Sequence, residues 1–212
     1  MTCDGPPAGI RIACPEWVAD IVDWDRRVHS DADKVRLTIR LARENVERGT
    51  GGPFGAAVFE MATGRLVSVG MNSVVRLHNA VLHGEVVALM MAQQRVGSFS
   101  LAAQGLPPHE LVTSCDPCAM CLGAILWSGV KRVVCGAARE DATRLRFDEG
   151  PVFPESYAYL RDRGIVIVHE VCRDEAREVL ELYRRRSGPI NNPSPPLAAG
   201  RGCGRGGAGH PV

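Results

Sequence analysis

Histidine and cysteine residues occur at a spacing that could hold a single metal ion. Cys118 and Cys121 are three positions apart, and on a helix such residues share one face, so both thiols can reach the same ion. Pro117 suits the first turn of a helix, where the helix dipole favours thiolates. His83 is followed two positions later by Glu85. Three protein ligands with one open position are typical of catalytic zinc, whereas structural zinc needs four protein ligands.

Glu85 is placed to move protons rather than to bind the metal. Residues two apart on a helix are separated by about 200° around its axis, so His83 and Glu85 would not ligate one ion from the same face. A carboxylate beside the site can instead exchange protons with a water molecule that zinc activates. The pattern His-x-Glu followed by Pro-Cys-x-x-Cys is the signature of zinc-dependent deaminases, and all five fixed residues occur here in that order.

Other interpretations compete for the cysteines. An isolated Cys-x-x-Cys can be a redox pair, but the nearby His-Gly-Glu would then be a coincidence. Cys115 extends the run to Cys-x-x-Cys-x-x-Cys, which could ligate an iron–sulfur cluster, yet no fourth cysteine follows at a suitable spacing. We therefore interpret Cys115 as a buried residue at the end of a strand. Cys135 and Cys172 lie in apolar runs and are predicted to be small core residues.

Helices and strands that alternate along the chain must position these residues. Periodicity predicts helices over 33–48, 83–94, 118–129, 154–163 and 174–186, with a short helix within 17–24. Runs rich in β-forming residues predict a hairpin of 55–60 and 65–69, followed by strands 111–114, 131–137 and 165–169. Alternation after an initial hairpin indicates an α/β layered domain with a partly parallel sheet.

Composition divides the 212 residues into three parts. Residues 1–30 form an irregular N-terminal arm, residues 31–187 the main domain, and residues 188–212 a tail rich in Gly and Pro that is predicted to be disordered. The net charge of +1 provides no overall field to collect phosphates, which disfavours a nucleic-acid binder. No apolar run is long enough for a membrane span, and residues 1–17 lack the apolar core of a signal peptide. We therefore expect a cytoplasmic protein with no membrane partner.

Beyond the zinc motif, the chain resembles the cytidine-deaminase superfamily, and within it the bacterial guanine deaminases of that fold. The resemblance spans residues 30–192. It includes Gly-Gly-Pro-Phe-Gly-Ala-Ala-Val-Phe from position 51, Ser-Cys-Asp-Pro-Cys-Ala-Met-Cys from 114 and Arg-Phe-Asp-Glu-Gly-Pro from 146. It implies a three-layer α/β/α sandwich around a mixed five-stranded sheet, one catalytic zinc ion per subunit, a homodimer and a small-molecule nucleobase as substrate.

The resemblance also assigns roles to individual residues. It implies that His83, Cys118 and Cys121 hold zinc and that Glu85 is the principal proton shuttle. It further implies a second catalytic carboxylate at Glu149, a side-chain amide at Asn72 that hydrogen-bonds the base, and an aromatic pocket wall at Phe54. We expect the backbone N–H of Gly84 to donate to a substrate carbonyl and Trp127 to add apolar wall surface to the pocket. Two positions depart from the usual family pattern, which has Ala at position 84 and Glu at the position of Asp116.

The activity that the resemblance implies is hydrolytic deamination of guanine to xanthine with release of ammonia. The sequence Leu-His-Gly-Glu also resembles fungal-type cytosine deaminases, so cytosine, a nucleoside or a triazine such as ammeline remains an alternative substrate for the same mechanism. A tRNA adenosine deaminase would flip its base into the same pocket but would need a basic channel. A non-enzymatic, zinc-stabilised interaction module is the alternative from a different class, although it would have little use for an open ligand position beside Glu85.

Overall fold

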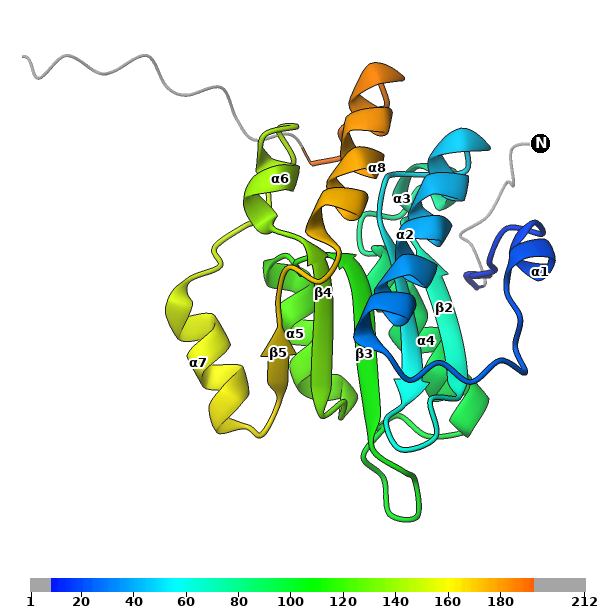
Figure 1. Cartoon of the computed structure of the whole chain (residues 1–212), viewed down its shortest axis with the longest axis vertical. Helices are drawn as coiled ribbons and strands as arrows, with labels where there is room; N and C mark the ends of the chain where they lie inside the picture. The colour runs from blue at the N-terminus through cyan, green and yellow to red at the C-terminus, as the bar shows by residue number, and fades with distance from the viewer. Residues whose placement is uncertain (1–8, 193–212) are drawn as a thin grey trace, which may run out of the picture.

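A five-stranded mixed sheet forms the centre of the computed structural model, which describes residues 9–192 (Figure 1). The strand order is β2-β1-β3-β4-β5. β1 (Gly55–Glu60) runs antiparallel to both β2 (Leu66–Met71) and β3 (His109–Cys115). β4 (Arg132–Ala137) and β5 (Val166–Val168) continue the sheet parallel to β3. The carboxyl ends of β2, β3, β4 and β5 therefore lie at one edge of the sheet.

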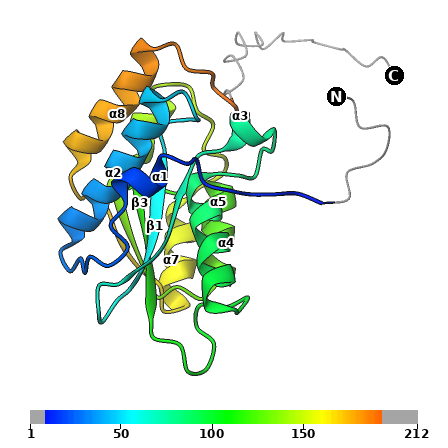
Figure 2. The ribbon, with the colours of Figure 1, turned by 90° about the vertical axis from the view of Figure 1, so that its right-hand side faces the viewer.

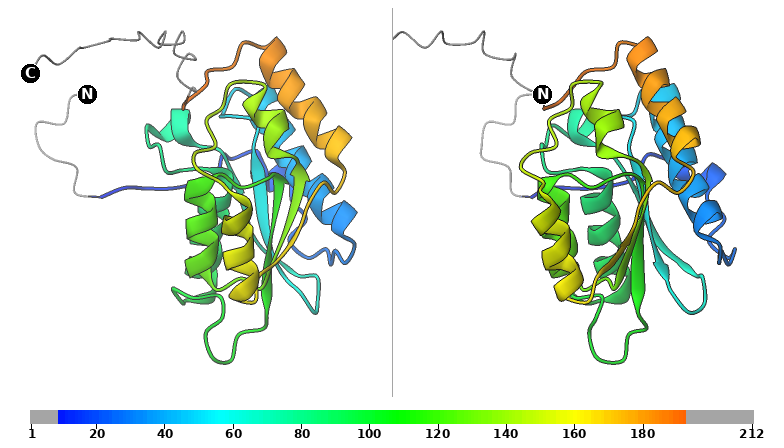
Figure 3. Two further views of the ribbon diagram at one scale, coloured as in Figure 1. Left: turned by 90° about the vertical axis from the view of Figure 1, so that its left-hand side faces the viewer. Right: turned by 60° about the vertical axis from the view of Figure 1, so that its left-hand side comes forward.

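Helices cover both faces of the sheet, which confirms the expected three-layer sandwich (Figure 2). One face carries α2 (Asp31–Glu47) and α8 (Arg173–Arg185). The other carries α4 (Gly84–Val96), α5 (Ala119–Ser128) and α7 (Pro154–Asp162) (Figure 3). Three short helices lie in connections: α1 (Val18–Ile21), α3 (Val74–Leu77) and α6 (Arg139–Thr143). Sequence periodicity did not predict α3 and α6, because four or five residues are too few to show a helical repeat.

Alternation along the strands gives each face its own hydrophobic core. In β1, Ala57 and Phe59 belong to the core under α2 and α8, while Ala56 and Val58 belong to the core under α4 and α5. Every residue of β1, β2 and β3 is buried, as expected for strands covered on both sides.

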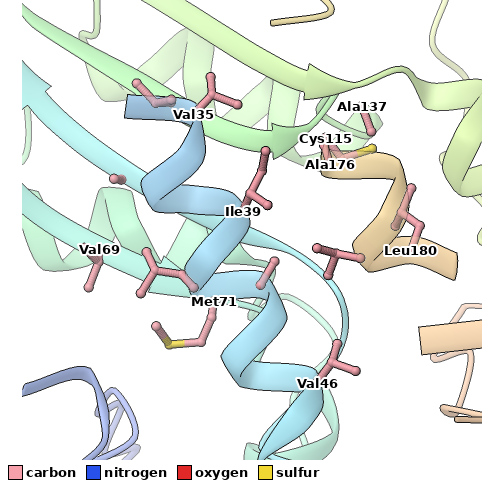
Figure 4. Close-up of a cluster of buried hydrophobic side chains, with 14 of the residues drawn as sticks. Val35, Ile39, Val46, Val69, Met71, Cys115, Ala137, Ala176 and Leu180 are labelled. Carbon is pink, nitrogen blue, oxygen red and sulfur yellow. The ribbon is translucent and has the colours of Figure 1, made fainter. Parts of the chain in front are cut away.

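The three cysteines that the sequence analysis interpreted as structural, Cys115, Cys135 and Cys172, lie in or against the two cores. Cys115 is buried in the core under α2 and α8 (Figure 4), as predicted for a strand-end residue. Cys135 is fully buried in the opposite core. Cys172 is only partly buried, because it follows the short strand β5 and caps α8 in a left-handed backbone conformation. The prediction of a core position is therefore right for Cys135, whereas Cys172 packs against the core under α2 and α8 without being fully buried.

Part of the predicted N-terminal arm packs on the domain. Trp17, Val18, Val22 and Val28 are all buried in the core under α2 and α8. Residues 1–8, and the predicted disordered tail from residue 193 onward, lie outside the described residues. Within residues 9–192, no helix combines the length and the apolar character needed to cross a membrane.

The first turn of α4 lies so close to β2 that one strand position has no room for a side chain. A Cβ atom at Gly70 would lie 2.2 Å from the carbonyl oxygen of Gly84 and 2.4 Å from the amide nitrogen of Ala88. Gly70 thus allows direct contact between the helix backbone and the sheet. This contact sets the position from which His83 and Glu85 extend.

We predict that Gly70→Ala pushes α4 away from β2 and lowers the free energy of unfolding by about 1–3 kcal/mol, the usual range for overpacking a core. Urea unfolding measures this effect. Gly9→Ala is the control, because this residue is exposed and an added Cβ there meets no atom within 4 Å. Equal stability of the two variants would contradict this account of Gly70.

Candidate active site

The predicted metal ligands meet where two helices begin, at the carboxyl edge of the sheet. His83 is the N-cap of α4 and Cys118 is the N-cap of α5, and both have extended backbone conformations. Cys121 lies one turn further along α5. The carboxyl edge of a parallel sheet segment is where α/β folds usually bind ligands.

The distances among these three side chains fit a zinc ion. His83 Nδ1 lies 3.5 Å from Cys118 Sγ and 3.7 Å from Cys121 Sγ. A tetrahedral site with Zn–S of about 2.3 Å and Zn–N of about 2.05 Å places sulfur and nitrogen ligands about 3.6 Å apart. Among the described residues this ligand group has three members. The donor set and its spacing therefore suit a zinc ion that keeps one position for water or substrate.

A pocket opens beside the ligands and brings together most of the predicted site residues. Its lining consists of Phe54, Asn72, His83, Glu85, Asp116, Cys118, Phe147, Glu149, Asn191 and Asn192. Six of the nine predicted residues are in this lining, and Cys121 belongs to the same ligand group as His83 and Cys118. Gly84 is buried next to the pocket, where an added Cβ would lie 3.3 Å from the Phe54 carbonyl oxygen. The Ala that is usual in the family would therefore fit tightly here.

Trp127 does not line this pocket. It lies in the last turn of α5, nine residues after Cys118, which corresponds to roughly 13 Å along a helix axis. Its side chain is 80% exposed and borders a separate surface hollow that also includes Lys131 and Tyr159. The expectation that Trp127 forms an apolar wall of the pocket is therefore wrong within one subunit.

The lining also contains residues to which sequence reasoning assigned no role. Phe147 packs edge-on against Phe54, with ring centroids 5.0 Å apart, and so extends the aromatic wall. Asn192 holds the loop that carries Glu149, because its carbonyl oxygen accepts from the Asp148 amide at 2.9 Å and its side chain donates back to the Asp148 carbonyl. Asn191 and Asn192 fall in the segment that composition assigned to the tail, and no local motif marks them.

Two amide oxygens of the lining are buried without a partner. Among the described residues, nothing donates to Oδ1 of Asn72 or to Oδ1 of Asn192. The Asn72 backbone is fixed, because its carbonyl oxygen accepts from Asn45 Nδ2 at 2.9 Å and its amide donates to the Phe54 carbonyl at 2.9 Å. Buried acceptors without a donor are costly. Both oxygens are therefore suited to N–H groups of a ligand.

Burial also controls the protonation of the carboxyl groups. Glu85 is 6% exposed, and burial together with the nearby Cys118 thiolate raises its pKa to about 7. Partial burial, with the charges of Cys118 and Glu85, raises the pKa of Glu149 to about 8. A hydrogen bond from Cys121 lowers the pKa of Cys118 to about 4. Two carboxyl groups whose pKa values lie near neutrality are suited to proton transfer at physiological pH.

Comparison with known proteins places the site in a deaminase family. Residues 29–137 match the cytidine and deoxycytidylate deaminase zinc-binding region. The chain is 36% identical to the guanine deaminase of Bacillus subtilis over 121 aligned residues. This aligned region covers 57% of this chain and 73% of that protein. It is 27% identical to a tRNA-specific adenosine deaminase of Buchnera aphidicola over 154 aligned residues, which cover 72% of this chain and 93% of that protein. A solved structure of guanine deaminase from Nitrosomonas europaea superimposes with a TM-score of 0.81 at 35% identity, covering 85% of this chain and 99% of that chain.

We predict that Cys121→Ser lowers the zinc content of the purified protein roughly ten-fold or more, because loss of one thiolate leaves two ligands. Elemental analysis measures the metal per chain. Cys115→Ser is the control, because Cys115 lies in the core under α2 and α8 and should leave the zinc content unchanged. Equal zinc in wild type and Cys121→Ser would rule out this ligand assignment.

Proposed function

This chain belongs to the cytidine and deoxycytidylate deaminase family, and from that premise we propose that it hydrolyses guanine to xanthine and ammonia. One observation carries the proposal: a three-ligand zinc group, two carboxyl groups with raised pKa values and two unpartnered amide oxygens meet in a single pocket. We further propose one zinc ion per subunit and a cytoplasmic location, where reducing conditions keep cysteines free.

The proton transfers follow from the two carboxyl groups. Zinc held by His83, Cys118 and Cys121 supplies a Lewis acid that activates water at neutral pH. Glu85 removes a proton from the attacking water and delivers it to the ring nitrogen beside the carbon under attack. Glu149, whose pKa is raised by burial, protonates the leaving amino group, and it regains a proton from the hydroxyl group left on that carbon as the carbonyl of xanthine forms. The sum is guanine plus water giving xanthine plus ammonia.

The pocket lining favours a bicyclic base that is rich in N–H groups. Phe54 and Phe147 provide aromatic surface for a planar ring. The free oxygens of Asn72 and Asn192 accept N–H donors, and they belong to segments that are far apart in the sequence. Guanine carries N–H groups on both of its rings, whereas cytosine has one ring only. Guanine is therefore the substrate that we favour over cytosine.

Nucleic acid is a weaker candidate substrate. The described part of the pocket lining contains three carboxylates and no Lys or Arg. A tRNA that inserts a base must bring its phosphates close to the pocket mouth, where basic side chains would be needed. Cytosine, nucleosides and ammeline remain as alternatives that share the same catalytic residues.

We also propose that two subunits pair through the outer face of α4 and α5. Met120 and Trp127 lie seven residues apart on α5, on one exposed face, and are 36% and 80% exposed. Met90 on the neighbouring α4 is 41% exposed. Large apolar side chains exposed together mark interaction surfaces. Trp127 would then serve assembly rather than the pocket of its own subunit.

We predict that wild-type protein loaded with zinc releases ammonia from guanine and that Glu85→Gln lowers kcat by about 10²–10⁴-fold while zinc stays bound, because positioned acid–base catalysis has that magnitude. Ammonia release is measured with guanine, cytosine, adenine, guanosine, cytidine and ammeline. Near-normal turnover by Glu85→Gln would contradict the assignment. Turnover of another compound in place of guanine would keep the mechanism and overturn the substrate.

We predict that Trp127→Glu converts a dimer into monomers, because a buried charge at the centre of an apolar contact is strongly unfavourable. Light scattering coupled to size-exclusion chromatography measures the mass. Met61→Glu is the control, because Met61 is a partly exposed apolar residue in the turn between β1 and β2, outside the α4/α5 face. A dimer that persists in Trp127→Glu would show that this face is not the interface.

A further inference from the structure

A second cluster of ligand-type side chains lies beside the active site and has no role in the proposed reaction. It consists of Asp116, which follows β3, Cys135 in β4, and His169, which follows β5. A metal site is a poor explanation, because His169 Nδ1 lies only 2.8 Å from Asp116 Oδ1. Nitrogen and oxygen ligands of tetrahedral zinc are about 3.4 Å apart. The pair is instead a hydrogen bond in which the His169 ring N–H donates to the Asp116 carboxylate.

Asp116 connects this hydrogen bond to the zinc ligands. It lines the pocket and lies two residues before Cys118, which begins α5. Its backbone amide donates to the Ala137 carbonyl at 2.8 Å, and its carboxylate accepts from His169 at 2.8 Å. The residue is thus attached to β4 through its backbone and to the end of β5 through its side chain. These two attachments set where the chain enters α5.

A second contact of the His169 ring, with Tyr157, connects it to the segment that carries Glu149. The ring packs nearly perpendicular to the ring of Tyr157 in α7, with centroids 5.1 Å apart and an interplanar angle of 84°. The Tyr157 hydroxyl accepts from Arg139 Nη2 at 2.9 Å, and Arg139 Nη1 donates to the Val152 carbonyl at 3.2 Å. Val152 lies three residues after Glu149, in the same connection between α6 and α7. His169 is therefore linked directly to Asp116 before α5 and, through Tyr157 and Arg139, to the connection between α6 and α7 that carries Glu149.

We propose that His169 is a positioning residue for the deaminase site: its ring N–H orients Asp116 and thereby Cys118, while the packing of its ring on Tyr157 orients the segment that carries Glu149. His169 is outside the pocket lining and acts through these neighbours. This inference rests on the proposed deaminase function. It assigns a role to a histidine that lies in no sequence motif.

The stability of the protein should depend little on this residue. The His169 side chain is 38% exposed, and ion pairs at exposed positions contribute about 0–1 kcal/mol. Replacing His169 should therefore leave the fold intact while it loosens the geometry of the site. An effect on catalysis can thus be separated from an effect on folding.

The test compares His169→Ala, His169→Asn and wild type, with His29→Ala as the control at an exposed histidine remote in sequence from the site. We expect His169→Ala to lower kcat roughly ten-fold, the scale of losses at groups that support a metal site, with KM changed less than about two-fold and an unchanged Tm. His169→Asn should recover most of kcat, because its side-chain amide can donate from the position of Nδ1. His29→Ala should match wild type.

A second readout does not depend on turnover. Cobalt in place of zinc gives an absorption spectrum that is sensitive to the thiolate geometry at Cys118, and we expect the spectrum to shift in His169→Ala and to return in His169→Asn. Wild-type kcat together with an unshifted spectrum in His169→Ala would overturn the proposal, as would an equal loss of kcat in both His169 variants. If wild type deaminates none of the bases tested, the proposed function fails, and an unshifted cobalt spectrum would then overturn the role of His169 separately.

Discussion

For this site to exist, two helices must begin so close together that the residues at their N-termini can bind one metal ion. His83 and Cys118 cap α4 and α5, and their ligand atoms are 3.5 Å apart. The position of each helix is fixed by contacts with residues outside that helix. α4 is set by the close contact of its backbone with Gly70 in β2, and α5 is set by the attachments of Asp116 to the neighbouring strands. The chemistry therefore depends on how both helices pack on one sheet.

The same enclosure that assembles the ligands also prepares the acids. Glu85 is buried and Glu149 is partly buried, and both lie near the Cys118 thiolate, so the ionised form of each is disfavoured and their pKa values rise to about 7 and about 8. In an open site both would be ionised at neutral pH and poor proton donors. Asn192, close to the end of the described residues, also lines this pocket, so the surroundings of the two carboxyl groups include segments from distant parts of the domain.

α5 serves two surfaces at once. Its start supplies Cys118 and Cys121 to the zinc group, while Met120 and Trp127 are exposed on its surface, as is Met90 on α4. In the proposed dimer, the helix that carries two zinc ligands is also part of the contact between subunits. Loss of that contact would leave an apolar surface exposed on the helices that carry all three ligands.

The sequence alone was sufficient for the long helices, the mixed sheet and the group of zinc ligands, because periodicity, turn residues and the three-residue cysteine spacing act over a few neighbouring positions. It could not decide which residues line the pocket. Trp127 is near Cys118 in the sequence but too far along the helix to reach the pocket, whereas Asn192 and Phe147 reach it from distant segments. His169 meets Asp116 across 53 positions. Such contacts follow from the packing of strand ends and loops in three dimensions, and no local pattern of residues records them.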